Sequence, residues 1–467
     1  MEKFRRASLL ALLLALPAFY ALRPVEDNDI FFHVRVGGWI AEHRAVTETD
    51  PFTVFGQGKP YVAYAWLFQL LVHGAHAALG WRGILAFEAL LATAIALAVF
   101  RLVSRQGPDF TKAAAVTGLA LAAVLRSIGP RSWLFTILFF TLELDWVLAA
   151  REAKNERRLL ALVPLFLLWA NLHVEFVHGL ALIFLLGFES LIERRPPWAI
   201  LGAGVACTLA TLVNPYGIGL WRTVLEYGTA SGAYAVIQEH AAPSFRQLSD
   251  WCGLALALLA TFALGWTRER RAFPYLLLAF GVALGFRSGR DGFALATIGA
   301  ALLARALASD TAKDTFPATR AGYVPVLAAS ALFLALVAWG RGLSEAHLEE
   351  SIARSFPDES AAFVEREKLE GPVFNDYDWG SYLIWRLPGR LVAIDGRTNL
   401  HGDDRILRSR ATWSGAPGWQ DDEDLQRSAT VIAPKGSPLT ALLAKDPRFV
   451  RVHDDDVATV FTRKKGP

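Results

Sequence analysis

Apolar runs separated by short polar segments fill the chain up to about residue 340, and their lengths predict helices that cross a membrane. A helix of about 20 mostly apolar residues crosses the hydrocarbon core of a bilayer, which is about 30 Å thick. By that criterion the chain has about eleven spans. They are placed near residues 7–22, 81–103, 113–125, 132–150, 159–172, 177–192, 198–213, 251–266, 274–286, 291–307 and 323–340. We therefore expect a multi-pass α-helical membrane protein.

A different pattern begins near residue 341, where charged residues become frequent and the apolar runs shorten. The runs RLVAIDGR (390–397), ATVIAP (429–434) and FVRVHDDDVATVFTRK (449–464) predict strands. Segments with helical spacing lie between them, and such alternation is typical of an α/β layer structure. We therefore expect two domains. They are a transmembrane domain over residues 1–342, with a first outer loop at 23–80, and a small α/β domain over residues 343–467.

Composition supports the membrane class and excludes several functions. Hydrophobic residues make up 54% of the 467 residues and charged residues only 19%, so the chain has more apolar surface than a soluble domain buries. The formal net charge of +3 comes largely from arginines at loop ends, which gives no basic surface for nucleic acid. The two cysteines, Cys207 and Cys252, lie in or beside apolar runs and indicate neither a disulfide framework nor a cysteine metal site.

Basic residues near the span ends predict the orientation, because cytoplasmic loops are enriched in Lys and Arg. The first apolar run lacks a small-residue cleavage site, so we interpret it as a span and not as a signal peptide. With the N-terminus inside, the basic segments at 101–112, 151–158, 194–195 and 268–271 face the cytoplasm. The first outer loop, the 214–250 loop and the C-terminal domain then lie outside, on the periplasmic or equivalent face of the membrane.

Asp27 and Asp29 follow the first span directly and open the outer loop. If the segment after them is helical, Asp29 and His33 lie four residues apart on one face. Two carboxylates beside a histidine suit a general base, a ligand set for a divalent cation, or both. Acidic residues also flank spans as ordinary polar anchors, which explains one of the two easily. We interpret both carboxylates as catalytic candidates and His33 as a substrate-binding candidate.

Four arginines at span ends lie on the side of the membrane where the orientation rule expects few basic residues. They are Arg126, Arg131, Arg287 and Arg290. Arg matches phosphate geometry through charge-assisted hydrogen bonds, so a phosphate at the membrane surface, such as a lipid head group, explains their position. The alternative is that they extend toward the interface or pair with loop carboxylates such as Asp291.

The segment WANLHVEFVHG places ionisable side chains between two apolar runs. Such residues are costly at membrane depth and normally face a cavity, so His173 and Glu175 are candidates for substrate binding. The spacing of His173, Glu175 and His178 does not fit the HExxH zinc pattern. Ordinary loop polarity is the competing explanation.

A later outer loop, at 214–250, opens with the helix-stop signal NPYG. Glu239 and His240 lie in this loop and are weaker candidates for substrate binding.

The stretch DNDIFFHVRVGGWIAEHRAVTETDPFTVFGQGKPYVAYAWLFQLLV resembles the first outer loop of the GT-C glycosyltransferases, in the bacterial group related to protein mannosyltransferases and lipopolysaccharide sugar transferases. Asp27 and Asp29 match the acidic motif of that superfamily, and TDPF fits the later part of its loop. The order of spans, loop and outer domain is also similar. The segment NDYDWGSYLIWRLPGRLVAIDGRTN is similar to the outer domain of oligosaccharyltransferase catalytic subunits, with the WWDYG motif permuted to DYDWG.

The resemblance implies a glycosyltransferase that takes its sugar from a polyprenyl-phosphate-linked donor and glycosylates a lipid, glycan or protein acceptor at the outer membrane face. Asp27 or Asp29 would then be the catalytic base, and the four arginines would bind the departing lipid phosphate. Some members of the superfamily use a metal and others do not. A Mg²⁺ or Mn²⁺ ion held by Asp27 and Asp29 therefore stays an open option, and no other cofactor is expected.

Two other classes of function remain open. A non-enzymatic transporter or binding scaffold for lipid-linked glycans would use the buried polar residues as a pathway, but the sequence lacks the inverted repeats typical of transporters. A glycan ligase or polymerase would keep the outer arginines without needing two carboxylates in the first loop.

Overall fold

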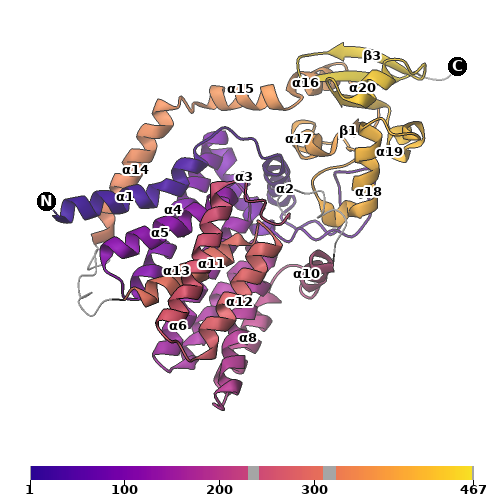
Figure 1. Cartoon of the computed structure of the whole chain (residues 1–467). Coiled ribbons are helices and arrows are strands. Elements are labelled where there is room, and N and C mark those ends of the chain that lie inside the picture. The colour runs from indigo at the N-terminus through magenta and orange to yellow at the C-terminus, as the bar shows by residue number, and fades with distance from the viewer. Residues whose placement is uncertain (1, 230–240, 309–321, 465–467) are drawn as a thin grey trace. The chain divides into compact units, whose positions relative to one another are not determined.

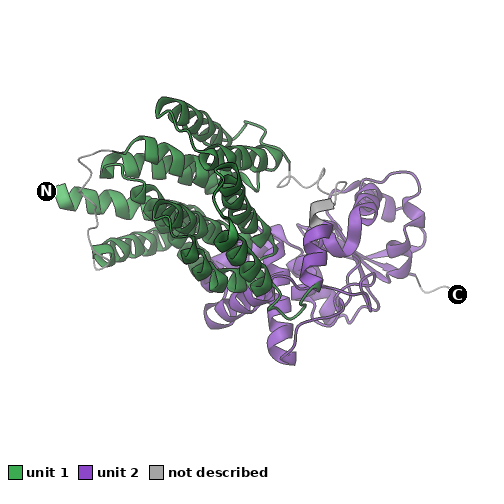
Figure 2. Ribbon diagram, turned by 90° about the horizontal axis from the view of Figure 1, so that it is seen from below, with its two compact units in different colours: residues 1–23, 85–218, 237–342 green, residues 24–84, 219–236, 343–467 purple. Residues whose placement is uncertain are grey.

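The computed structural model describes residues 2–229, 241–308 and 322–464. Contacts between residues divide the chain into two compact units, which Figure 2 colours green and purple. Unit 1 consists of residues 1–23, 85–218 and 237–342, and unit 2 consists of residues 24–84, 219–236 and 343–467. Each unit is described by itself. That residues 343–467 form a domain of their own remains a prediction.

Unit 1 is made of helices joined by short connections (Figure 1). They are α1 (Glu2–Ala21), α4 (Trp81–Arg105, which begins in unit 2), α5 (Phe110–Val124), α6 (Trp133–Glu152), α7 (Val163–Leu172), α8 (Val177–Ile192), α9 (Trp198–Thr211), α11 (Leu248–Trp266), α12 (Ala272–Arg287), α13 (Gly292–Ala306) and α14 (Tyr323–Gly340). Each of the eleven predicted spans contains one of these helices in whole or in large part, because the apolar runs of the sequence are also its helical runs.

Seven segments of the described chain are long and apolar enough to cross a membrane. They are Glu2–Ala21, Trp81–Arg105, Phe110–Ser127, Trp133–Glu152, Val174–Ile192, Leu248–Trp266 and Tyr323–Gly340. Helices α9, α12 and α13 are apolar but shorter. The predicted span at 159–172 is divided between a 3-10 segment, Glu156–Leu162, and the ten-residue α7. The prediction of a multi-pass helical membrane protein is confirmed.

Several basic residues that predicted cytoplasmic loops form ion pairs at one end of unit 1. Arg105, the last residue of α4, pairs with Asp145 of α6 at 2.8 Å. Arg151 donates from Nε to Glu189 Oε2 at 2.8 Å, which joins the last turns of α6 and α8. These carboxylates are almost fully buried, so the arginines offset the cost of placing them inside the bundle.

Unit 2 combines helices with one small sheet. Its helices are α2 (Asp29–His43), α3 (Trp66–Leu79), α10 (Gly219–Thr229), α15 (Glu345–Ser355), α16 (Asp358–Arg366), α17 (Gly380–Arg386), α18 (Thr398–Trp413), α19 (Glu423–Arg427) and α20 (Pro438–Leu443). Its strands are β1 (Val373–Asn375), β2 (Thr430–Pro434), β3 (Phe449–Asp454) and β4 (Ala458–Arg463). The predicted α/β character of the C-terminal region is confirmed.

The sheet has the order β1-β2-β4-β3, with β1 parallel to β2 and the other pairs antiparallel. Buried side chains such as Phe374, Val431 and Phe461 form its core with Trp413 of α18. The run RLVAIDGR was expected to form a strand but makes only single bridges, from Val392 to β1 and to the first outer loop. A continuous strand does not form because the end of this run turns to place charged side chains inside unit 2.

Helices α2 and α3 of the first outer loop pack closely at Gly37. A Cβ added there would lie 2.0 Å from the carbonyl oxygen of Gln69, whereas a Cβ at Gly74 in α3 would meet nothing within 4 Å. We expect Gly37→Ala to destabilise unit 2 by about 1–3 kcal/mol, because rigid backbone must move. Gly74→Ala is the matched control and should be neutral or stabilising by up to about 1 kcal/mol. Thermal unfolding of both variants in detergent checks the prediction, and equal melting temperatures would contradict it.

Candidate functional site

Asp29 and His33 line one small cavity in unit 2. Asp29 is the first residue of α2 and His33 lies one turn later, so the expectation that they share a face is confirmed. The cavity measures about 50 Å³. Its lining consists of Asp29, Phe32, His33, Tyr61, Tyr64, Ala65, Gln69, Ser381, Gly396, Arg397 and Asn399. Aromatic rings and a few convergent polar groups are typical of a site for a small polar ligand.

Asp27, unlike Asp29, contacts the backbone at the start of α2. Its Oδ1 accepts a hydrogen bond from the backbone N–H of Asp29 at 3.0 Å, so it satisfies one of the free donors at the start of α2. The next residue, Asn28, donates from Nδ2 to the carbonyl oxygen of Asp378 at 3.0 Å. The two residues thus fix the first turn of α2 and with it the position of Asp29. A catalytic role for either carboxylate remains a prediction.

Gly396 lets the chain pass close to Asp29. A Cβ at this position would lie 2.4 Å from Asp29 Oδ1, so a larger residue would displace the carboxylate. Tyr377 donates its hydroxyl to the carbonyl oxygen of Gly396 at 3.1 Å. Burial and then the nearby Asp29 carboxylate raise the pKa of Tyr377, so its hydroxyl keeps its proton and stays a donor. The hydrogen bond from Tyr377 therefore fixes the backbone of Gly396, which lies against the Asp29 carboxylate.

Arg397 carries the buried charge of this region and is only 7% exposed. Its Nε and Nη2 donate to the two oxygens of Asp395 at 2.8 and 2.6 Å, and its Nη1 donates to Asp50 at 2.8 Å. Its guanidinium also lies 4.5 Å from the ring centroid of Phe32 and 4.8 Å from that of Tyr61. Burial alone would raise the pKa of Asp395, but Arg397 and His401 outweigh it and hold that pKa below its usual value. Arg397 thus joins the TDPF loop to the IDGR segment beside the cavity.

Gln69 of α3 supports His33. Its Nε2 lies 3.3 Å from Nδ1 of the His33 ring, and Phe68 packs edge-on against the same ring with centroids 5.0 Å apart. Gln69 is 1% exposed, and its Oε1 has no hydrogen-bond partner among the described residues. A buried amide oxygen without a partner is costly, so this oxygen suits a hydroxyl of a bound ligand. The sequence analysis missed Gln69.

The other candidates lie in unit 1, where His173 follows α7 directly. Its Nδ1 lies 2.8 Å from Thr136 Oγ1 of α6, and its Nε2 lies 3.1 Å from Arg290 Nη2. Because a guanidinium only donates, Nε2 is the acceptor, and Nδ1 carries the proton of the neutral ring. Trp169 Nε1 donates to the same Thr136 hydroxyl at 2.9 Å. His173 is therefore buried, fixed and directed at Arg290.

Two of the four candidate arginines come together on one indole ring. The guanidinium groups of Arg131 and Arg290 lie 4.9 and 4.7 Å from the ring centroid of Trp133, the first residue of α6. Arg290 Nη2 also forms an ion pair with Glu175 Oε1 at 2.9 Å. His173, Glu175 and the two arginines thus form one group in unit 1, which we call the Arg290 group.

The remaining candidates are not part of the Arg290 group. Arg126 pairs with Asp250 of α11 at 3.6 Å, and Arg287 is exposed at the end of α12. Arg126 and Arg290 thus pair with acidic residues, as the alternative explanation expected, and the partners described are Asp250 and Glu175. Glu239 and His240 lie outside the described residues.

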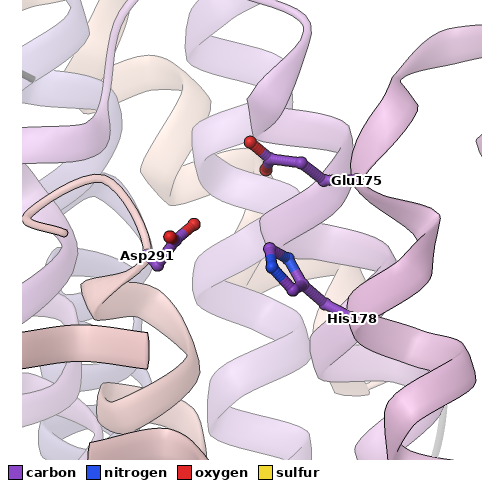
Figure 3. Close-up of side chains that lie close together, drawn as sticks. All are labelled: Glu175, His178 and Asp291. Carbon is purple, nitrogen blue, oxygen red and sulfur yellow. The ribbon is translucent and has the colours of Figure 1, made fainter. Parts of the chain in front are cut away.

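Within the described ranges, three metal-ligating side chains converge at Glu175, His178 and Asp291, with ligand atoms within 4.8 Å of one another (Figure 3). Asp27 and Asp29 are not part of this group, and Oδ1 of Asp27 already accepts a backbone hydrogen bond. A metal ion at Asp27 and Asp29 therefore stays a prediction. Sequence reasoning noted His178 only as a polar neighbour, because Asp291 follows it 113 positions later and no sequence pattern links the two.

No protein-family model and no curated protein sequence matches the chain. Solved structures do match it. Arabinofuranosyltransferase AftD from Mycobacteria matches 99% of this chain over 40% of its own, with 14% identity and a TM-score of 0.58. The apo oligosaccharyltransferase of Archaeoglobus fulgidus matches 91% of this chain over 69% of its own, with 13% identity and a TM-score of 0.54. ArnT from Cupriavidus metallidurans, bound to undecaprenyl phosphate, matches 97% of both chains with 15% identity and a TM-score of 0.51.

These similar structures are GT-C membrane glycosyltransferases. The chain has the GT-C fold. The resemblance that the first outer loop suggested is thereby confirmed for the fold, and the multi-pass architecture agrees with it. The chain spans 40% of the length of AftD, and at 13–15% identity the likeness concerns the GT-C fold alone.

Proposed function

We propose that this chain is a glycosyltransferase that uses a polyprenyl-phosphate-linked sugar and acts at the outer face of a bacterial cytoplasmic membrane, with its N-terminus inside. The observation that carries the proposal is the position of Asp29 in a GT-C fold, where it lines a polar cavity with His33. AftD transfers a sugar by its name, and ArnT is a structure with undecaprenyl phosphate bound. The acceptor is a hydroxyl group of a lipid, glycan or protein.

Asp29 is the proposed catalytic base. The acceptor hydroxyl attacks the anomeric carbon and gives its proton to the Asp29 carboxylate, while the bond from that carbon to the phosphate oxygen breaks. The products are an inverted glycoside and a polyprenyl phosphate. Gln69, His33 and Tyr64 belong to the lining of the same cavity and supply hydrogen-bonding groups that orient a hydroxyl. Asp27 contributes by fixing the first turn of α2.

The Arg290 group is the proposed phosphate site. A departing phosphate develops negative charge, and preorganised donors at that position lower the barrier. The guanidinium groups of Arg131 and Arg290 both lie within 5 Å of the ring centroid of Trp133, and Arg290 also donates to His173 Nε2. Two guanidinium groups held in this way match the geometry of a phosphate. Arg126 and Arg287 are secondary candidates for the same role.

Arg290→Gln is expected to raise the KM for the lipid-linked donor at least about tenfold, because a hydrogen bond to a charged group contributes about 1.5–3 kcal/mol. The matched control is Arg305→Gln, since Arg305 forms an ion pair of the same length, 2.9 Å, with Glu152. That variant should keep the wild-type KM. Initial rates against donor concentration check both, and an unchanged KM in Arg290→Gln would remove the arginine from the phosphate site.

The competing classes of function differ in what happens to the donor. Full-length protein in proteoliposomes is given a panel of polyprenyl-phosphate sugars, and the lipid products are identified by mass spectrometry. A glycosyltransferase releases free polyprenyl phosphate from at least one donor, and Asp29→Asn stops the release. A transporter or scaffold leaves every donor intact, and a ligase or polymerase releases the carrier equally well in the Asp29 variant. Either of the last two results would overturn the proposal.

A further inference from the structure

We propose that Glu175, His178 and Asp291 form a binding site for one divalent cation in unit 1. This cation site goes beyond the proposed transfer reaction and does not depend on it. Glu175 lies in the 3-10 turn Val174–Phe176, and His178 lies in the first turn of α8. Glu175 has backbone angles outside the helical range (φ −82°, ψ 20°), so the turn before α8 sets its position. Asp291 comes from the residue before α13.

Figure 3 shows the side chains of Glu175 and His178 directed at Asp291. One ligand atom from each residue lies within 4.8 Å of the other two. Donor atoms bound to a single ion at about 2.1 Å stand about 3–4 Å apart. Small side-chain rotations therefore close the three atoms around an ion, without movement of the helices.

Two of the three side chains have a buried polar atom that lacks a hydrogen-bond partner among the described residues. Glu175 Oε2 and His178 Nδ1 are buried and have no hydrogen bond among the described residues. Asp291 is 9% exposed, and one of its carboxylate oxygens lies within 4.8 Å of a ligand atom of each of the other two residues. Native structures rarely leave such groups unsatisfied, and a bound ion is a common reason where they do. A divalent cation would satisfy all three together.

The charges around the site also favour a cation. Glu175 Oε1 is occupied by Arg290 at 2.9 Å, which leaves Oε2 free to turn toward the ion. His173 Nδ1 lies 3.7 Å from Oε2, too far for a hydrogen bond, and is engaged with Thr136. Two carboxylates, those of Glu175 and Asp291, thus lie close together, and one direct ion pair is described for them, from Arg290 to Glu175. A divalent cation between the carboxylates would offset their mutual repulsion.

The donor set indicates the kind of ion. Two carboxylates suit Mg²⁺ and Mn²⁺, and one imidazole favours Mn²⁺ over Mg²⁺. Three protein ligands leave coordination positions open for water or for an oxygen of an anionic ligand. If the proposed function holds, those positions lie beside Arg290 and would take a phosphate oxygen of the donor.

The test is a Mn²⁺ titration of full-length protein in lipid nanodiscs, followed by the EPR signal of free Mn²⁺. We expect one saturable site per chain. Asp291→Asn and His178→Gln should each weaken Mn²⁺ binding at least tenfold, since ligand sets are sensitive even to changes around them. Asp29→Asn is the control and should keep the wild-type affinity. A monodisperse elution profile and a thermal melt confirm that each variant is folded.

Three results would overturn the cation site. They are wild-type protein that binds no Mn²⁺, binding that survives both Asp291→Asn and His178→Gln, and binding that is lost in Asp29→Asn. A wild-type protein that binds Mn²⁺ at this site but transfers no sugar would refute the proposed function alone.

Discussion

Asp29→Asn is expected to lower the rate of sugar transfer by about 100- to 10,000-fold, which is the contribution typical of a positioned general base. The substitution keeps the size and shape of the side chain, so the cavity that Asp29 shares with His33 should persist. What is lost is the carboxylate that takes the acceptor proton. Binding of polyprenyl phosphate should stay within about twofold of wild type, because phosphate binding is assigned to other residues. Single-turnover rates and lipid binding, measured on the same preparation, check the prediction.

Asp27→Asn separates the two carboxylates. An asparagine Oδ1 still accepts the hydrogen bond from the Asp29 N–H, and Asn is about as good as Asp at the start of a helix. We therefore expect transfer to fall by less than about tenfold. A loss in Asp27→Asn that equals the loss in Asp29→Asn would show that both carboxylates act in the reaction. An active Asp29→Asn variant would remove Asp29 from the mechanism.

Arg397→Met is expected to destabilise unit 2 by about 3–5 kcal/mol, the usual cost of removing one partner from a buried ion pair. Asp395 is fully buried and Asp50 nearly so, and both would lose their main cation. The cavity should suffer as well, because Phe32 and Tyr61 pack on the lost guanidinium. Thermal unfolding and limited proteolysis of the full-length protein in detergent provide the measurement.

Arg386→Met is the matched control for Arg397→Met. Arg386 pairs with Asp358 at 2.8 Å, but the two side chains are 24% and 41% exposed. Partly exposed pairs contribute at most about 1 kcal/mol, so this variant should melt close to wild type. If Arg397→Met also melts close to wild type, the buried network does not hold the TDPF loop to the IDGR segment.

Much of the architecture could be predicted from the sequence, because membrane helices are specified by local composition. Each apolar run became a helix, including short ones such as α9 and α13. The strand expected at RLVAIDGR did not form, since Asp395 and Arg397 turn inward to pair with each other and with Asp50. Hydrophobic periodicity does not predict that ion pair, because Asp50 and Arg397 lie 347 positions apart in the chain.

The candidate site was predictable only where its residues are neighbours in sequence. Asp29 and His33 were placed on one face by their spacing, and both line the same cavity. Ser381 and Asn399, which share that cavity, come from the far end of the chain and carry no local signal. The same holds for Asp291, which the sequence offered only as a partner for arginine. Its position opposite Glu175 and His178 depends on how α8 and α13 pack.

The most direct test of the central claim counts products. Full-length protein in proteoliposomes is supplied with a polyprenyl-phosphate sugar and an acceptor, and the amounts of glycosylated acceptor and free polyprenyl phosphate are measured together. A glycosyltransferase with Asp29 as its base should form the two products in equal amounts in the wild type and neither in Asp29→Asn. Donor that stays whole in the wild type, or carrier release that continues without Asp29, would contradict the account.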